Sequence, residues 1–402
     1  MNILIFSEEY RKITKGMFRV WVAHADEASK KHQVHILLNR EHWAFDELQE
    51  KFRSNNQILV HRLSFDMPDT IFRRCLGLGC SNGNSGLLKL GGRALNYFFF
   101  PFIIFYMVLR VWQIRPDALF AHNGGWPAGR LCRWMTFVAL LARVPSRIFI
   151  IHNFPYLRSS YIAIVCFLRS IVWAWVIDKC ATSIVTVSDS VKAELEKVFR
   201  QPVLRIHNGI DLSSEDGSDS SPLSWSPSGP AVGFVGALTP LKGPHFLLDS
   251  FKLLEIPCEL ALLGPSSQDY LKLLEEKTKL CANKVIFLGF HQDVDAFIKK
   301  IDFLVVPSTA FESFGMVILE AMKHSKAVIC TDHGGMKEVV EDGVTGLVVP
   351  STDELRLERA ITKLLVNPDM ASRMGKAGYQ RLNKLFNSDI MAAHYDSLLN
   401  RG

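Results

Sequence analysis

Two glutamates, Glu312 and Glu320, stand eight positions apart across a short loop, Ser313–Gly315, that opens a helix. The loop follows an apolar run, Asp302–Val306, that is typical of a buried strand, and Met316–Met322 has the apolar spacing of a helix. A strand, loop and helix in this order direct backbone N–H groups and the positive end of the helix dipole at the loop, where a phosphate would bind. With Glu320 roughly two turns into the helix, the two carboxylates could hold hydroxyl groups at opposite ends of one extended ligand. A nucleotide sugar has this shape.

Further fixed spacings follow this helix. Glu312-x7-Glu320 is followed by Gly334-Gly335 with Glu338, and then by Asp342-Gly343-x-x-Gly346. The pattern resembles the retaining glycosyltransferases of family 4, which have the GT-B fold. The resemblance implies an α/β protein with two Rossmann-like domains of doubly wound parallel sheet that face a central cleft. It also implies transfer of a sugar from a nucleoside diphosphate sugar to a hydroxyl group with retention of the anomeric configuration.

The same resemblance assigns roles to the residues of the second half. Glu320 would hold the ribose hydroxyls and Glu312 the sugar hydroxyls. Lys242, between an expected strand and helix, would stabilise the charge that develops on the diphosphate, together with backbone N–H groups at the helix start. No metal and no cofactor other than the donor co-substrate is implied. The family often has Arg where this chain has Ala237, which leaves one cation fewer at the leaving group.

Two histidines of the first half come directly at the ends of expected strands. His122, with Asn123 after it, follows the expected strand 118–121, and His152 follows the expected strand 147–151. In the family, the position that matches His152 lies near the reacting sugar carbon, and the position that matches His122 lines the acceptor side. The resemblance therefore implies three sets of site residues. The catalytic set is Glu312, His152 and Lys242, the acceptor set is His122 and Asn123, and the donor set is Gly16, Lys242, Ser313, Phe314, Gly315, Met316, Val317 and Glu320.

Two shorter motifs carry less weight. Gly16-Met17 is expected to end the first strand–helix loop, where the family has paired glycines, and here the second glycine is missing. Asp293-Val294-Asp295 has the Asp-x-Asp pattern that binds the metal in a different glycosyltransferase fold, GT-A. Because it precedes the helical pattern Ala296–Lys300, we expect Asp293 to cap a helix and not to bind a metal.

Length and composition fit a two-domain globular protein. The chain has 402 residues, of which 48% are hydrophobic and 21% charged, and its eight cysteines lack CxxC spacing. These features favour a reducing, cytoplasmic compartment, and the short apolar run at the N-terminus is not that of a signal peptide. Short apolar runs alternate with helical patterns, as in parallel sheets covered by helices. The expected strands are 2–6, 34–38, 58–63, 118–121, 147–151, 183–187 and 203–206 in the first half, and 231–235, 259–263, 285–288, 303–306, 327–329 and 346–348 in the second.

The segment Asp211–Pro230 has eight serines and three prolines without apolar periodicity, so we expect a flexible linker there. The predicted domains are an N-terminal acceptor and membrane domain at 1–210 and a donor domain at 231–384. A C-terminal helix, at 385–402, is expected to return to the first domain. The turn at Asn208-Gly209 is interpreted as a hinge marker and not as a ligand.

Charge is divided unevenly along the chain. Residues 1–210 have 27 Lys/Arg and 15 Asp/Glu, a balance of +12, and residues 51–150 alone have 13 against three, a balance of +10. The run Ala94–Leu109 has 16 residues without a charge, too few to span a bilayer and interrupted by Pro101. We expect it to lie in the interface of an anionic membrane, peripheral on the inner face. A pair of buried core helices is the alternative, and nucleic acid is the less favoured anionic partner.

The predicted reaction uses a nucleotide sugar, with UDP favoured, and a lipid-linked glycan acceptor of surface polysaccharide or lipopolysaccharide assembly. Two other functions stay open. One is a non-catalytic nucleotide-sugar-binding scaffold on a membrane, which the departures at Ala237 and Met17 would allow. The other is a glycoside hydrolase that uses Glu312 and Glu320, which would require the two carboxyl groups to lie about 5–10 Å apart.

Overall fold

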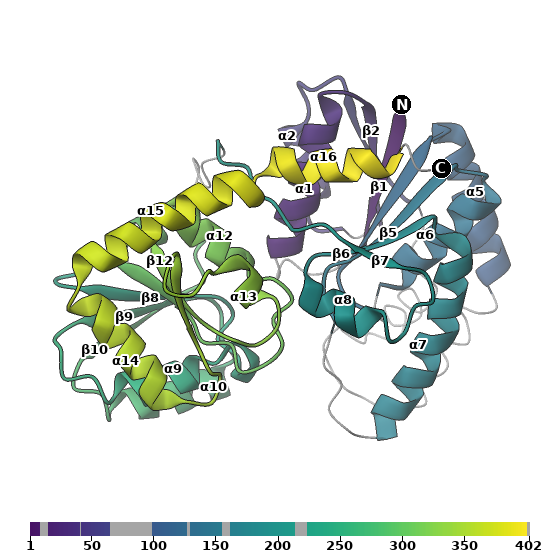
Figure 1. Ribbon diagram of the computed structural model, residues 1–402. Coiled ribbons are helices and arrows are strands. Elements are labelled where there is room, and N and C mark those ends of the chain that lie inside the picture. Colours follow the sequence, from purple (N-terminus) through teal and green to yellow (C-terminus); the bar gives the residue numbers. More distant parts are fainter. Residues whose placement is uncertain are drawn as a thin grey trace. The chain divides into compact units, whose positions relative to one another are not determined.

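The computed structural model describes residues 1–8, 15–40, 42–64, 99–126, 129–154, 161–213 and 223–399. Contacts divide the chain into two compact units, each built on its own β-sheet (Figure 1). Unit 1 comprises Met1–Thr186, Glu194–Leu204 and Ala392–Gly402, and unit 2 comprises Val187–Ala193 and Arg205–Met391. The glycine-rich stretch 77–92 and residues 94–98 of the uncharged run lie outside the described residues.

The sheet of unit 1 has the strand order β3-β2-β1-β4-β5-β6-β7, and its pairs from β3 to β6 are parallel. The order reverses at β1, so right-handed crossovers place helices on both faces of the sheet. The strands are β1 (Asn2–Ser7), β2 (Gln33–Leu38), β3 (Ile58–Arg62), β4 (Ala118–Asn123), β5 (Ser146–Ile151), β6 (Ser183–Thr186) and β7 (Val203–Arg205).

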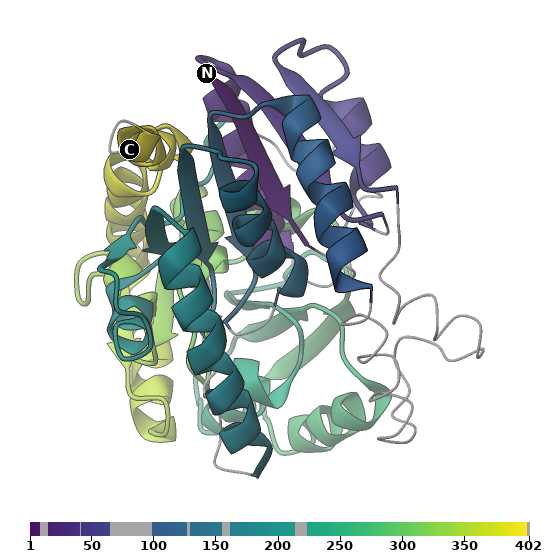
Figure 2. The ribbon, with the colours of Figure 1, turned by 90° about the vertical axis from the view of Figure 1, so that its right-hand side faces the viewer.

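The helices of the first half are α1 (Lys15–Ser29), α2 (Phe45–Lys51), α5 (Phe100–Ile114), α6 (Arg130–Leu141), α7 (Tyr161–Cys180) and α8 (Asp189–Leu195). Helix α6 packs against both α5 and α7, and the three lie side by side over the sheet (Figure 2). Pro101 stands in the first turn of α5. A proline at this position lacks only an N–H that has no partner inside the helix. Pro101 therefore stands at the start of the helix and, contrary to the expectation, does not interrupt it.

The sheet of unit 2 has the order β10-β9-β8-β11-β12-β13, again with parallel pairs that reverse at the first strand of the unit. Its strands are β8 (Ala231–Val235), β9 (Glu259–Leu263), β10 (Lys284–Gly289), β11 (Phe303–Val306), β12 (Ala327–Thr331) and β13 (Gly346–Val349). Its helices are η1 (Pro240–Lys242), α9 (Pro244–Phe251), α10 (Gln268–Thr278), α11 (Val294–Lys300), α12 (Met316–Lys323), α13 (Met336–Val339), α14 (Glu354–Leu365) and α15 (Pro368–Leu385). Every strand predicted from the sequence is present, with ends that differ by no more than two residues.

Alternate residues of these strands belong to two hydrophobic clusters. Along β11, Phe303 and Val305 pack in one cluster, and Leu304 and Val306 pack in the other. Since successive strand residues point to opposite faces, the sheet of unit 2 is buried on both sides. Burial on both sides explains why its strands appear in the sequence as continuous apolar runs.

The structure corrects part of the expected linker. Trp225 is buried and packs 5.5 Å from the ring of Phe297, while Lys300 donates to the main-chain oxygens of Leu223 and Trp225. The buried indole of Trp225 therefore fixes the described end of the linker, from Leu223 to Pro230, on unit 2. The serine-rich composition of the segment had not predicted this contact. Residues 214–222 lie outside the described part of the chain.

The last helix, α16 (Ser388–Leu399), begins in unit 2 and ends in unit 1. In unit 1 the ring of Tyr395 lies 4.5 Å from that of His24 and 5.7 Å from that of Phe120, and Lys31 pairs with Asp396 at 3.0 Å. In unit 2, Ile210 N donates to the carbonyl of Phe386 and Ser388 N donates to that of Ile210. The expected turn at Asn208-Gly209 thus stands beside the start of this helix.

Candidate functional site

The two glutamates of the leading motif lie on one strand–loop–helix of unit 2. Glu312 lies in the loop between β11 and α12, and Glu320 is the fifth residue of α12. Glu320 is therefore little more than one turn into the helix and not two, because residues 312–315 are not helical. Both side chains are half-buried.

The main chain of Glu312 is held by the pair Gly334-Gly335. Gly335 N donates to the carbonyl of Glu312 at 2.8 Å, and Glu312 forms an isolated parallel bridge with Gly334. Gly334 has φ +82°, and a Cβ there would lie 2.2 Å from that carbonyl oxygen. Only glycine fits this close approach, so the paired glycines of the motif fix the position of the Glu312 main chain.

Lys242 and Glu312, 70 positions apart in the sequence, meet in an ion pair between Nζ and Oε2. Lys242 ends the 3-10 helix η1, and the next residue, Gly243, has φ +71° and lies against the carbonyl of Pro307, the residue after β11. This contact brings the loop after β8 to the loop after β11. The Lys242 side chain remains 41% exposed, so a diphosphate could reach the ammonium group without the protein unfolding.

The loop before α12 offers its main chain and not its side chains. Phe314 is buried and packs 5.6 Å from the ring of His207 and 5.8 Å from that of Phe386, and Ser313 is buried as well. Of the proposed donor set, Phe314 can therefore contribute only its backbone. Gly315 is the residue before α12, and Met316 and Val317 are its half-buried first residues, where helix N–H groups lack partners within the helix.

Gly16 and Met17 lie inside the first turn of α1 and do not end a loop, as the sequence suggested. The sulfur of Met17 is 3.3 Å from where a Cβ on Gly124 would stand. Met17 thus lies over the segment that follows Asn123. Asn123 itself accepts from Gly125 N at 2.9 Å through its side-chain oxygen.

His122 and His152 are in direct contact in unit 1. Nδ1 of His122 lies 2.9 Å from Nε2 of His152, and both side chains are buried at the carboxyl ends of β4 and β5. Burial lowers the pKa of His152 to about 4 and, with the neighbouring histidines, lowers that of His122 well below its usual range. Both rings are therefore neutral at pH 7.

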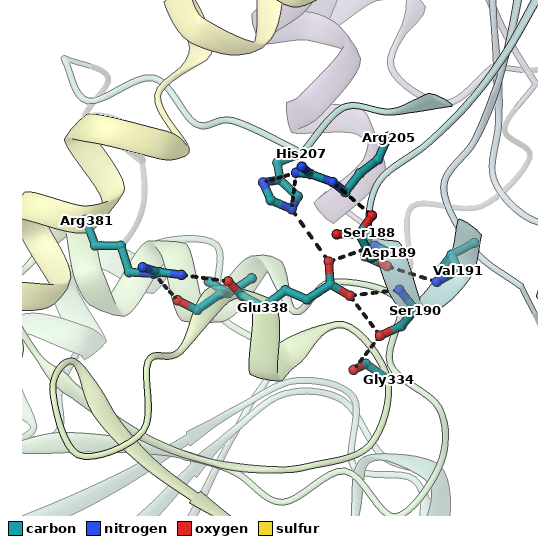
Figure 3. A network of polar contacts seen from close by, with 10 residues as sticks. Ser188, Asp189, Ser190, Val191, Arg205, His207, Gly334, Glu338 and Arg381 are labelled. Carbon is teal, nitrogen blue, oxygen red and sulfur yellow. Dashed lines mark hydrogen bonds and ion pairs between the residues drawn. The ribbon is translucent and has the colours of Figure 1, made fainter. Parts of the chain in front are cut away.

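Glu338 belongs to a polar network that the sequence did not reveal (Figure 3). Its carboxylate accepts from Asp189 N at 2.7 Å and from both Ser190 N and Ser190 Oγ at 2.8 Å, and Nε2 of His207 lies 3.6 Å away. Burial alone would raise the pKa of Glu338, but the hydrogen bonds from His207, Asp189 and Ser190 lower it to about 2. The carboxylate caps the start of α8, and Ser190 Oγ also reaches the carbonyl of Gly334. The spacing Gly-Gly-x-x-Glu was the only sequence signal for this role.

Glu8 is a second residue that sequence reasoning missed. It follows β1, and its carboxylate accepts from Leu131 N at 2.7 Å, in the first turn of α6. Burial raises the pKa of Glu8, while this N–H and the charges of Arg130 and Arg133 act in the opposite direction. No pattern around Glu8 predicted a partner 123 positions away.

The carboxylates of Asp293-Val294-Asp295 both have protein partners. Asp293 accepts from Ala296 N at 2.7 Å and caps α11, as the sequence predicted. Asp295 is buried and lies 2.7 Å from Nε2 of His324 and 3.6 Å from Nζ of Lys323. These contacts give the motif a structural role in unit 2.

Helix α5 has two apolar faces. Ile103, Ile104 and Met107 are buried in unit 1, whereas Phe102 is 69% and Phe105 63% exposed. Leu109 and Trp112 on α5 are exposed as well, and so are Ile171, Val172 and Trp175 on α7. The buried side of α5 thus packs as expected for a core helix, and binding of the exposed side to a membrane stays a prediction. No helix among the described residues is both long and apolar enough to cross a membrane.

Part of the chain is similar to known glycosyltransferases. The profile described as Glycosyl transferases group 1 matches residues 219–381. The chain is 32% identical over 199 residues to an uncharacterized glycosyltransferase of Methanocaldococcus jannaschii, which covers 48% of this chain and 53% of that protein. It is 28% identical over 169 residues to O-antigen chain mannosyltransferase C of Escherichia coli, which covers 41% of this chain and 45% of that protein. The chain spans about half the length of the curated relatives it matches.

Solved structures support the fold over the whole chain. The Anabaena protein Alr3699/HepE in complex with UDP superposes with a TM-score of 0.73 at 20% identity and covers all of both chains. At this identity the likeness shows the fold alone. The two parallel, doubly wound sheets are those of the GT-B fold, which confirms the predicted fold class.

Proposed function

We propose that the protein is a retaining glycosyltransferase of the family 4 type. It moves a sugar from a nucleoside diphosphate sugar, with UDP favoured, to a hydroxyl group of a lipid-linked glycan in surface polysaccharide or lipopolysaccharide assembly. The match of residues 219–381 to the profile described as Glycosyl transferases group 1 supports this proposal. The observation that carries the proposal is the ion pair of Lys242 with Glu312 beside the N-terminal end of α12. A cation, a carboxylate and helix N–H groups are the set that a diphosphate next to a sugar requires.

The residues would act as follows. Lys242 and the N–H groups of Phe314–Val317 stabilise the negative charge that develops on the diphosphate as its bond to the sugar carbon breaks. Glu312 accepts hydrogen bonds from sugar hydroxyls and holds Lys242 in place before the donor binds. Glu320 accepts hydrogen bonds from the ribose hydroxyls. The acceptor oxygen forms the new bond on the same face of the sugar, and its proton passes to the leaving phosphate oxygen, so no carboxylate is needed as a base.

Donor binding is the first test. Thermal unfolding in UDP-, GDP- and dTDP-sugars should show a rise in Tm for one nucleotide, because a ligand that binds only the folded state stabilises it. The nucleotide that stabilises the protein should then be released as free nucleoside diphosphate when acceptor is added. Release of free sugar without any nucleotide requirement would favour the hydrolase, and binding without turnover would favour the scaffold.

The second test compares substitutions of the two glutamates, one expected to change the donor KM and the other kcat. Glu320→Gln should raise the donor KM about tenfold with little change in kcat, because the ribose contact is the same before and during reaction. Glu312→Gln should mainly lower kcat, by about 2–4 kcal/mol in the barrier, because it misplaces both the sugar and Lys242. Glu276→Gln is the matched control, since Glu276 lies on α10 and pairs with Lys279 of the next turn. Wild-type kinetics in both site variants would contradict the site.

The proposal also includes peripheral binding to the anionic inner face of the membrane, where a lipid-linked acceptor is found. Phe102, Phe105 and Trp112 on α5 and Trp175 on α7 are each more than half exposed. Exposed aromatic side chains enter the headgroup region, and a balance of +10 over residues 51–150 adds attraction to anionic lipid. The protein would thus act in the cytoplasm, at the membrane surface.

A further inference from the structure

Three histidines of unit 1 form one hydrogen-bonded chain, here called the histidine chain. His24 Nδ1, on α1, lies 3.3 Å from Nε2 of His122 at the end of β4. His122 Nδ1 lies 2.9 Å from Nε2 of His152, which follows β5, and these two rings stack with 16° between their planes. The exposed fractions are 1%, 0% and 7%, so water does not enter between the rings.

Burial keeps the three rings neutral, and neutral rings can form the histidine chain only if all their N–H groups point the same way. Burial lowers the pKa of His24 to about 3 and that of His152 to about 4, and it also lowers that of His122, so all three rings are neutral near pH 7. A neutral imidazole has one N–H and one lone pair. The three rings can therefore be linked in only two ways, with every N–H directed from His24 towards His152 or every N–H directed back.

The ends of the chain decide between the two directions. Among the described residues, neither His152 Nδ1 nor His24 Nε2 has a hydrogen-bond partner, and both atoms are buried. The His24 ring is enclosed by the rings of Phe120, at 4.7 Å, and Tyr395, at 4.5 Å. The charge of Asp396 also acts on His24, but this carboxylate pairs with Lys31 at 3.0 Å and does not accept a hydrogen bond from the ring. Either direction leaves one N–H without a protein partner, and such an N–H is costlier at the end that aromatic rings enclose. This places the protons on Nδ1 of all three rings.

The free end of the chain lies where a ligand is expected. His152 follows the carboxyl end of β5, and ligands of open α/β sheets bind beyond the carboxyl ends of strands. A buried N–H that lacks a partner in the protein is stabilised once a ligand supplies an acceptor. A hydroxyl oxygen of the transferred sugar or of the acceptor is such a group.

We propose that His122 and His24 are positioning residues that keep the proton of His152 on Nδ1, where it donates to a substrate hydroxyl oxygen. His152 touches the substrate, and the other two act through it. The inference rests on the proposed function for the identity of the substrate, whereas the tautomers are a property of the protein alone. In water, a neutral histidine carries its proton mainly on Nε2, so the three Nδ1–H tautomers would be a distinctive signature.

Two substitutions at His24 separate positioning from packing. His24→Asn places an amide near the former Nδ1, where it can still donate to His122, but it gives up aromatic contacts with Phe120 and Tyr395. His24→Phe keeps those contacts and removes the donor. We expect His24→Phe to lower kcat about tenfold with an unchanged donor KM, and His24→Asn to retain most of the activity. A residue that only packs would show the reverse order.

Nitrogen-15 NMR of the histidine-labelled full-length protein near pH 7 supplies a readout that does not depend on turnover. Wild-type His24, His122 and His152 should each show a protonated Nδ1, and His24→Phe should shift His122 and His152 towards Nε2–H. His35→Phe is the control, since His35 on β2 pairs with His61 at 2.9 Å and does not belong to the histidine chain. This variant should change neither kcat nor the tautomers of His122 and His152. The proposal is overturned if wild-type His152 is protonated on Nε2, or if His24→Phe is as active as His24→Asn. If no nucleotide sugar stabilises the wild type, the proposed function fails while the NMR result still decides the tautomers.

Discussion

Replacement of Glu338 by glutamine tests the network that holds the start of α8 on unit 2 (Figure 3). One carboxylate oxygen accepts from Asp189 N, and the other accepts from the N–H and the hydroxyl of Ser190. A glutamine of the same length can offer only one oxygen to these donors. Its NH2 group must face at least one N–H, so a donor–donor contact replaces a charge-assisted hydrogen bond.

The pKa of Glu338 sets the magnitude. Despite burial, which acts in the opposite direction, the hydrogen bonds lower this pKa from 4.5 to about 2. The difference corresponds to about 3 kcal/mol of preference for the carboxylate over the protonated acid in the folded state. Because the amide resembles the protonated acid in charge and shape, Glu338→Gln should lower the free energy of unfolding by about 3 kcal/mol at pH 7.

The pH dependence has a definite sign. The folded-state pKa lies below the unfolded value, so the contribution is complete above about pH 4.5 and is lost as pH falls towards 2. The difference between wild type and Glu338→Gln should thus shrink by about 1 kcal/mol at pH 4 and by about 2 kcal/mol at pH 3. Urea unfolding followed by circular dichroism at pH 7, 4 and 3 measures this difference.

A neighbouring carboxylate provides the control. Glu341 pairs with Arg381 at 2.9 Å but is 52% exposed, so Glu341→Gln should cost less than about 1 kcal/mol at every pH. The reasoning would be refuted if Glu338→Gln changed the unfolding free energy at pH 7 by no more than Glu341→Gln. It would also be refuted if the full difference persisted at pH 3, because the carboxylate would then not be its source.

Three further outcomes are expected. Gly334→Ala should destabilise unit 2 by about 1–3 kcal/mol and weaken donor binding, because its Cβ would lie 2.2 Å from a main-chain oxygen. Gly343→Ala, at a similar positive φ but in open space, should cost less and leave donor binding unchanged. Thermal unfolding with and without donor measures both effects. Asp293→Ala should cost about 1 kcal/mol through the lost cap yet leave transfer unchanged in EDTA, and activity that is lost in EDTA and restored by Mn²⁺ or Mg²⁺ would contradict the mechanism. Phe102→Ser with Phe105→Ser should release the protein from anionic vesicles in flotation with an unchanged circular dichroism spectrum, and a wild type that ignores such vesicles at low salt would refute the membrane proposal.

The membrane prediction also shows where the sequence pattern was too coarse. The uncharged run gave no means of telling Ile103, which is buried, from Phe102 beside it, which is 69% exposed. Hydrophobicity specifies that a side chain avoids water but not whether protein or lipid will cover it. The position of α5 against α6 and the sheet of unit 1 decides which face is covered by protein.

The sequence by itself determined the strands and their order of alternation with helices, because burial on both faces leaves continuous apolar runs that are legible locally. It also determined the cap at Asp293, which depends on residues only a few positions apart. The tertiary structure alone decided that Lys242 meets Glu312, and that Glu338 binds Ser190, 148 positions away. The same holds for His24, which reaches His152 through His122 across three elements. Such pairs arise where the carboxyl ends of parallel strands and the helix starts beside them converge, and periodicity along the chain does not record which distant side chains will face one another there.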